Sequence, residues 1–245
     1  MTYCVGMLLQ AGLVMLADSR TNAGVDHINT FRKLRVYERP GERCLVLMSA
    51  GNLAITQSLA STLDEVLRFD GESPGLLEVP TMFEAARHIG DVLRAVHRRD
   101  AESLAAFGID FNASLILGGQ IAGEPPRLFS IYAAGNFIEA TRETPYFQIG
   151  ESKYGKPILD RVLRWDTPLD EAVKCALISM DSTIRSNLSV GLPLDLAIIE
   201  RDGLSLASHH LIDAENAYFA MVRARWGDAL REAFDAIPNP DGAFD

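Results

Sequence analysis

The sequence predicts an α+β fold, a four-layer α-β-β-α sandwich in which two antiparallel sheets pack between outer helices. Short apolar runs separated by turn residues alternate with pairs of amphipathic segments, in the order strands, two helices, strands, two helices, strands. Strands joined by short turns pair antiparallel, and each helix pair covers a sheet face with its apolar side. At 245 residues and 26.8 kDa, a single domain over 1–245 is expected, with a loosely held tail at about 238–245.

The first half of the chain predicts a hairpin, two further strands and two helices. The expected strands are residues 3–9, 13–17, 33–37 and 44–49, and the expected helices cover 53–67 and the segment from Met82 onward. The stretch 22–29 has no regular pattern. Thr81 followed three residues later by Glu84 is the capping-box signature of the second helix. Its inward stripe has apolar residues at helical spacing: Met82, Ala86, Ile89, Leu93 and Val96.

The second half repeats the order of strands and then two helices, which indicates a pseudo-symmetric build. The expected strands are 111–117 and 127–134 around a turn at 118–126, a short strand ending at Gly150, and a hairpin of 194–200 with 204–208. The expected helices are 154–165, 169–188 and 214–236. Asp202-Gly203 is the turn signal of the hairpin, and Pro168 is tolerated at a helix start because its missing N–H costs little there.

Composition limits the classes of binding partner and the cellular compartment that we expect for this protein. A net charge of −10 and a pI near 5.0 argue against nucleic acid and anionic membranes, which both favour clustered Lys and Arg. No run of 18 apolar residues and no secretory signal pattern is found, so we expect a cytoplasmic protein. The cysteines Cys4, Cys44 and Cys175 are isolated in apolar stretches, as expected of reduced core residues.

The histidines do not form a set of metal ligands. His88 and His97 stand nine positions apart on one expected helix, and the adjacent His209 and His210 face opposite sides of a strand. His27 lies on a loop. We therefore expect neither a metal nor a cofactor.

Thr2 is the first candidate for chemistry because it follows Met1 and opens directly into an apolar strand. Once Met1 is removed, the α-amine of Thr2 has an ordinary pKa of about 7.7–8.0 and can accept the proton of its own hydroxyl near neutral pH. Many ordinary proteins begin Met-Thr, so this interpretation depends on the residues that follow. Cys4 with a His partner is the rival nucleophile, but its apolar neighbours indicate an inert thiol.

Asp18 and Lys33 have structural interpretations as well as catalytic ones. Asp18 ends a strand at a turn, where structural aspartates are common, and Arg20 could pair with it to brace the loop. Lys33 stands beside Arg32 and Arg35 and could be a solvated strand residue. Their residue types alone do not decide between these roles.

The opening block of the chain resembles a known family. Residues 2–6 and 12–21, Lys33, and the break Ser49-Ala50-Gly51 before a helix are similar to the N-terminal hairpin region of proteasome β-subunits. The run 18–24 and Phe31-Arg32-Lys33 look most like the bacterial ancestral β-subunit family, known as Anbu. The likeness extends along the chain and is densest in its first 60 residues. It implies the N-terminal nucleophile (Ntn) hydrolase fold.

The resemblance implies a role for each residue that matches. Thr2 would attack the scissile carbonyl through Oγ, and its free amine would act as the general base. Lys33 would lower the pKa of that amine as a nearby like charge, and Asp18 would keep Lys33 charged and oriented. The backbone N–H of Gly51 would donate to the oxyanion, since a glycine lets the backbone approach the substrate.

Weaker matches imply supporting residues near the amine. Ser152, in Gly150-Glu151-Ser152, resembles one supporting serine, and Ser189, in the segment 186–191, resembles a second. The classical proteasome subunit has an Asp three positions before that second serine, where this chain has Ser186. Asp181, one or two helical turns earlier, is the candidate substitute.

The expected activity is that of a self-compartmentalising threonine peptidase that cleaves peptide or other amide bonds through an ester on Thr2. The family implies a homo-oligomer, either a ring or a helically offset ring, and the loop 21–30 is expected to line its substrate groove. The sequence does not indicate whether an unfoldase docks on it. Two alternatives stay open: a scaffold or binding assembly with little activity, and an amidase acting on a small amide.

Overall fold

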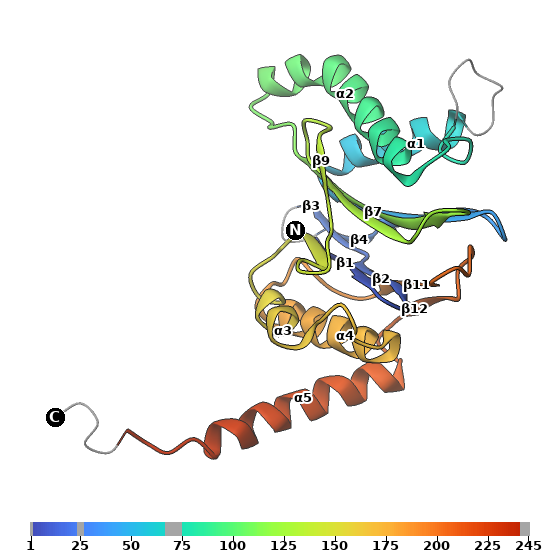
Figure 1. Ribbon diagram of the computed structural model, residues 1–245. Helices are drawn as coiled ribbons and strands as arrows, with labels where there is room; N and C mark the ends of the chain where they lie inside the picture. Colours follow the sequence, from blue (N-terminus) through green and yellow to red (C-terminus); the bar gives the residue numbers. More distant parts are fainter. Residues whose placement is uncertain (1, 24–26, 67–74, 241–245) are drawn as a thin grey trace.

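The computed structural model describes residues 2–23, 27–66 and 75–240 and confirms the α+β class, with two antiparallel five-stranded sheets (Figure 1). The first sheet has the order β10-β1-β2-β11-β12, formed by Tyr146–Gly150, Tyr3–Leu9, Gly12–Asp18, Leu194–Glu200 and Ser208–Ile212. The second has the order β5-β6-β7-β8-β9, formed by Leu34–Arg39, Arg43–Gly51, Ala113–Ile121, Arg127–Ile131 and Phe137–Glu139.

Helices cover the outer face of each sheet, which completes the expected four layers (Figure 1). The second sheet is covered by α1 (Leu53–Val66) and α2 (Met82–Ala106), and the first by α3 (Lys156–Val162) and α4 (Leu169–Ser186). The last helix, α5 (Ala217–Asp235), packs outside α4 and extends beyond the body of the sandwich. None of the helices in the described segments is long and apolar enough to cross a membrane.

Three apolar clusters fill the three spaces between the layers, and β1 contributes to two of them. Tyr3, Val5 and Met7 belong to the cluster under α3 and α4, whereas Cys4 and Leu8 belong to the cluster between the sheets. Successive side chains of a strand point to opposite faces, so a strand buried on both faces is apolar throughout. This is why the chain begins with an unbroken apolar run, and it fixes the start of β1 firmly in the sandwich.

Several expectations for individual elements are confirmed. The Thr81 side chain caps α2 by accepting a hydrogen bond from the Glu84 N–H (3.1 Å), and the five residues of the expected inward stripe are buried. The helix expected at 53–67 is α1, and Leu67 lies outside the described residues. The helix expected at 214–236 begins at Ala217, because Asn216 caps it through the Phe219 N–H (2.9 Å).

Two stretches that were predicted to be irregular or turns contain strands. The segment 22–29 overlaps β3 (Arg20–Ala23) and β4 (His27–Thr30), a two-stranded ribbon that lacks the apolar alternation of a buried strand. The turn predicted at 118–126 is wrong in its first part, because β7 continues to Ile121. A Cβ on Gly119 would lie 2.4 Å from the Cys44 carbonyl oxygen, so this glycine marks close approach of two strands. The short strand β9 was not predicted.

The second strand predicted for the last hairpin, 204–208, is wrong because β12 begins only at Ser208. Asp202 and Leu204 have left-handed φ angles of 63° and 51°, which widen the turn into a loop. This loop is bound to the opposite sheet: the Asp202 N–H donates to Gln120 Oε1 (2.8 Å), and Gln120 Nε2 donates to Asp202 Oδ1 (2.7 Å). Of the expected tail, residues 238–240 have no regular structure and 241–245 lie outside the described residues.

Candidate active site

Thr2 lies at the start of β1, half-buried between the ends of β2 and β10. Its carbonyl oxygen accepts a hydrogen bond from the Glu151 N–H (2.6 Å). Gly150 has a φ of +81°, and a Cβ added to it would lie 2.0 Å from the same oxygen. Any side chain at position 150 would displace Thr2, so a glycine is required there. Met1 lies outside the described residues.

Asp18 and Lys33, which the resemblance places in one site, form a buried ion pair next to Thr2. Asp18 ends β2 opposite Tyr3, whose N–H donates to Asp18 Oδ1 (3.0 Å). Lys33 Nζ donates to the same oxygen (2.7 Å) and to the Arg20 carbonyl (2.7 Å). Asp18 Oδ2 accepts the Gly191 N–H (3.3 Å). Asp18 is fully buried and Lys33 is 7% exposed, so the pair is no solvated surface contact.

The surroundings of Asp18 favour a fixed orientation of the Lys33 ammonium. Burial raises the pKa of the Asp18 carboxyl above its ordinary value, and Lys33 and the two backbone N–H groups act in the opposite direction. An ammonium has three N–H donors, and two of those on Lys33 have acceptors within the described part of the chain. The third N–H of the Lys33 ammonium can donate to a group in the depression that Lys33 and Thr2 line together.

Two adjoining depressions open at Thr2. The first, of about 190 Å³, lies between β5, β6 and α1 and includes Lys33 in its wall. The second, of about 410 Å³, extends toward Asn112, Ser114 and Gly150. Both share a common lining of Thr2, Thr21, Ala50, Gly51 and Leu53. A substrate chain that extends from one depression into the other would pass next to Thr2, which lines both.

Gly51 lies at the end of β6 and lines both depressions. Its φ of +117° is one that other residues rarely adopt, and a Cβ would lie 2.3 Å from the Asn112 carbonyl oxygen. The backbone of Gly51 therefore faces the depressions without a side chain. Its role as an oxyanion donor stays a prediction.

Arg20 braces a loop and does not pair with Asp18. Its Nη1 donates to the Leu188 carbonyl (3.2 Å), and its guanidinium packs against Gly191. Among the ion pairs of the described residues, the partner of Asp18 is Lys33. The suggestion of an Arg20–Asp18 pair is therefore wrong, whereas Arg20 does hold the segment that delivers the Gly191 N–H to Asp18.

The two expected supporting serines lie in the segments that follow β10 and α4, and their roles stay predictions. Ser189 is half-buried and donates its backbone N–H to Asn187 Oδ1 (3.0 Å), whereas Ser152 is exposed. Asp181 is not the substitute for the missing Asp at Ser186. It is buried between α4 and α5, where Arg185 Nε (3.0 Å) and Arg223 Nε (2.7 Å) bind its two oxygens.

Sequence reasoning missed two residues, Glu151, which contacts Thr2, and Asn187, which contacts Glu151. Glu151 is 6% exposed, and its carboxylate accepts the Lys153 N–H (3.0 Å) and Asn187 Nδ2 (3.0 Å). The signal that could have found Glu151 is an acidic residue directly after the strand-ending Gly150. Asn187 carries no such signal, because it looks like an ordinary residue after a helix.

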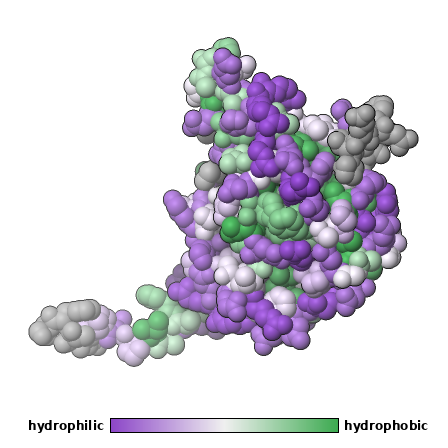
Figure 2. Space-filling view, turned by 45° about the horizontal axis from the view of Figure 1, so that its top comes forward, coloured by the Kyte–Doolittle hydropathy of each residue, from purple (hydrophilic) through white to green (hydrophobic). Residues whose placement is uncertain are grey.

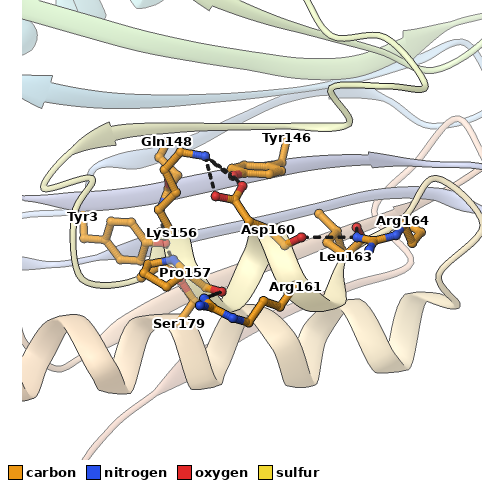
Figure 3. Close-up of polar contacts among 11 residues, drawn as sticks. Tyr3, Tyr146, Gln148, Lys156, Pro157, Asp160, Arg161, Leu163, Arg164 and Ser179 are labelled. Carbon is orange, nitrogen blue, oxygen red and sulfur yellow. Dashed lines mark hydrogen bonds and ion pairs between the residues drawn. The ribbon is translucent and has the colours of Figure 1, made fainter. Parts of the chain in front are cut away.

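A buried polar cluster anchors β1 immediately behind Thr2 (Figure 3). Tyr3 is fully buried, its hydroxyl lies 2.6 Å from Ser179 Oγ, and it accepts Gln148 Nε2 (2.7 Å). Ser179 donates to the Gly155 carbonyl (3.0 Å), so the Tyr3 hydroxyl donates to Ser179. Burial raises the pKa of the Tyr3 hydroxyl. The cluster ties the start of β1 to β10 and α4.

The cysteines do not supply the nucleophile. All three are buried and free, and burial raises the pKa of Cys4, that of Cys44 to about 12 and that of Cys175 to about 11. Thiols at such pKa values carry almost no thiolate at neutral pH. Within the described segments, no three His, Cys, Asp or Glu side chains come together as metal ligands do.

Comparisons with known proteins find solved structures of the same overall fold. The structure is similar to Anbu (ancestral β-subunit) from Yersinia bercovieri, with 56% identity, a TM-score of 0.90 and coverage of 97% of this chain and 98% of that one. It is also similar to Anbu from Pseudomonas aeruginosa, described as a helical assembly, with 50% identity, a TM-score of 0.93 and coverage of 99% and 100%.

More distant relatives are proteasome β-subunits. The proteasome subunit beta of Haloquadratum walsbyi is 26% identical over 210 residues, covering 85% of this chain and 77% of the relative. The proteasome subunit beta 2 of Nitrosopumilus maritimus is 26% identical over 215 residues, covering 84% and 89%. No protein-family model matches the chain. The identity of 50–56% over nearly the whole chain shows that the protein belongs to the Anbu family, proteasome-β-like proteins with the Ntn-hydrolase fold.

Proposed function

We propose that this protein is a threonine-type N-terminal nucleophile hydrolase that cleaves peptide or amide bonds through Thr2 after removal of Met1. The observation that carries the proposal is the buried Asp18–Lys33 pair in the wall of the depression that Thr2 lines. A buried ammonium beside a free amine lowers the pKa of that amine and leaves more of it in the basic form at neutral pH. The amine is then a base that needs no separate histidine.

The proposed reaction has two steps. The Thr2 amine takes the hydroxyl proton while Oγ attacks the substrate carbonyl, and the oxyanion of the tetrahedral intermediate is bound by the Gly51 N–H. The protonated amine returns the proton to the leaving amine as the C–N bond breaks, which leaves an ester on Thr2. Water, deprotonated by the same amine, then hydrolyses the ester to an acid and restores Thr2.

The lining of the first depression suggests what substrates it accepts. Its wall contains apolar side chains, among them Phe31, Leu47 and Leu59. Three cations also line it: Lys33 and Arg35 are paired with Asp18 (2.7 Å) and Asp64 (2.6 Å), and Arg32 is exposed. An apolar or mixed side chain next to the cleaved bond therefore fits best. The expected loop 21–30 contributes Thr21, and residues 24–26 lie outside the described segments.

The proposal includes self-assembly into a ring or a helically offset homo-oligomer. The P. aeruginosa relative is described as a helical assembly. In this chain the outer end of α5 and the residues after it expose the large apolar side chains Leu230, Phe234 and Ile237, and Figure 2 shows apolar side chains beside the grey C-terminal segment. Exposed apolar side chains at one helix end are typical of a protein interface.

Intact mass and covalent labelling test the hydrolase proposal. A peptide epoxyketone, which reacts with a hydroxyl and a free amine on one residue, should add to the native protein once per chain. The Thr2→Ala variant should lose both labelling and peptide hydrolysis. Retention of Met1 in protein from the native source, or equal turnover by Thr2→Ala, would contradict the proposal.

A scaffold or binding assembly of low activity is the second candidate. It is favoured by one observation: Ser186 stands where the classical subunit has an Asp, and the Asp181 carboxylate is bound by two arginines instead. A processed N-terminus that labels with the epoxyketone but hydrolyses neither peptides nor small amides would support this candidate. Turnover of small amides alone would indicate an amidase.

A further inference from the structure

We infer that Glu151 is a positioning residue for Thr2, and that it acts through its own backbone and through Asn187. The inference rests on the proposed function, because it concerns how the nucleophile is held. Glu151 contacts the Thr2 main chain directly: its N–H donates to the Thr2 carbonyl at 2.6 Å. A displacement of this carboxyl-bearing residue is therefore transmitted to the nucleophile without an intervening side chain.

The Glu151 carboxylate also holds the loop on the other side of the site. Its Oε2 accepts Asn187 Nδ2 (3.0 Å), and Asn187 Oδ1 accepts the Ser189 N–H (3.0 Å). Two residues further on, the Gly191 N–H donates to Asp18 Oδ2 (3.3 Å). One continuous set of contacts along the loop 187–191 thus joins Thr2 and Glu151 to the Asp18–Lys33 pair.

The burial of Glu151 needs an explanation that local structure does not give. Its carboxylate is largely shielded from water, and within the described residues no Lys, Arg or His lies within ion-pair distance of it. A buried acidic group without a cation is costly, so such groups are normally paired or functional. Removal of Met1 would create a free amine on the residue whose carbonyl accepts the Glu151 N–H, and this amine is the base of the proposed reaction.

The hydrogen-bond directions allow a sharp test by exchanging donor and acceptor. In Glu151→Gln, the amide oxygen can still accept the Lys153 N–H, but the amide nitrogen then faces Asn187 Nδ2, and two donors meet. In Asn187→Asp, two carboxylates meet. The double variant Glu151→Gln with Asn187→Asp restores every bond, because the new carboxylate at position 187 accepts from the new amide at position 151 and from the Ser189 N–H. It also keeps the net charge.

The experiment measures kcat, KM and the epoxyketone labelling rate of the processed oligomer for each variant, with thermal unfolding as the folding control. Each single variant should reduce kcat and the labelling rate by about 10- to 100-fold with little change in KM. The double variant should return to within about threefold of the native protein. Glu102→Gln, which removes an exposed carboxylate on α2, is the matched control and should change neither rate.

Native activity in Glu151→Gln, or a folded double variant as inactive as the singles, would overturn the inference and leave the proposed function intact. Failure of the native, processed protein to label would instead overturn the proposed function, and this inference with it. If a single variant fails to assemble, the double variant decides: a folded double variant whose kcat and labelling rate stay reduced overturns the inference, and one with native thermal stability and both rates within about threefold of native supports it.

Discussion

The Asp18–Lys33 pair can be tested by removing its charges one at a time and then together. Asp18→Asn leaves the Lys33 ammonium, 7% exposed, without its counter-charge at 2.7 Å. Breaking a buried ion pair from one side costs about 3–5 kcal/mol of stability. Lys33→Met leaves a fully buried carboxyl that can take up a proton, so its cost should fall at the lower end, about 3 kcal/mol.

The double variant Asp18→Asn with Lys33→Met separates stability from chemistry. Neither charge is then buried, and replacement of a buried pair by uncharged residues of similar size is often close to neutral. The free energy of unfolding should recover to within about 1–2 kcal/mol of the native value. The labelling rate of Thr2 should stay at least about 100-fold below native in all three variants, because the ammonium is absent or misdirected.

The assay combines denaturant unfolding with epoxyketone labelling of processed protein. Arg98→Met removes an exposed cation on α2 and serves as the control for loss of positive charge. The reasoning is refuted if Lys33→Met labels within about threefold of the native rate. Recovery of labelling in the double variant would also refute it, since the pair would then serve folding alone.

Three further predictions follow from the same structure. Gly51→Ala should lower kcat by about 100-fold or more and destabilise the fold by about 1–3 kcal/mol, because φ is +117° and the new Cβ would meet the Asn112 carbonyl oxygen. Peptide turnover and unfolding measure the two effects, and a native kcat would contradict the oxyanion role. Iodoacetamide at pH 8 should leave all three cysteines of the folded protein unmodified, as measured by intact mass. A pKa of about 12 leaves about one Cys44 side chain in ten thousand as the reactive thiolate. Rapid modification of the folded protein would contradict the burial of these cysteines. The destabilisation caused by Lys33→Met should be smaller near pH 5 than near pH 8. Burial raises the pKa of the folded Asp18 carboxyl, so the folded state binds its proton more tightly, and this stabilising contribution is present at low pH and lost as pH rises through the folded pKa. A pH-independent difference in unfolding free energy would argue against a buried Asp18.

The fold could be predicted because its signals are local. Both halves alternate apolar strands with amphipathic helices, and the cap at Thr81 marks the start of α2 within one residue. The failures come from tertiary contacts. The Asp202-Gly203 signal predicts a tight hairpin, but Gln120, 82 positions away, binds Asp202 and holds the turn as a wider loop. Neither residue indicates the other in the sequence.

The candidate site likewise depends on tertiary contacts that local sequence signals do not indicate. Asp18 ends β2 in one sheet and Lys33 precedes β5 in the other, so no periodicity brings them together, and only the resemblance predicted their contact. Glu151 and Asn187 were missed because they lie 36 positions apart, after the end of β10 and in the loop after α4. Single polar residues in loops have no spacing from which a partner can be predicted. The resemblance pointed to Ser152, which is exposed and directly follows the buried Glu151.

Antiparallel pairing explains why these residues meet at one end of the sandwich. β1 pairs with β2 on one side and β10 on the other, so the start of β1 must lie beside the ends of both, where Thr2, Asp18 and Glu151 stand. In the second sheet, β5 begins where β6 ends, which brings Lys33 and Gly51 to the same end of that sheet. Each group is therefore positioned by a strand that is buried on at least one face. Substitutions in the interior of these strands should act mainly on stability, whereas substitutions at their site-facing ends and in the loop 187–191 should act on turnover as well.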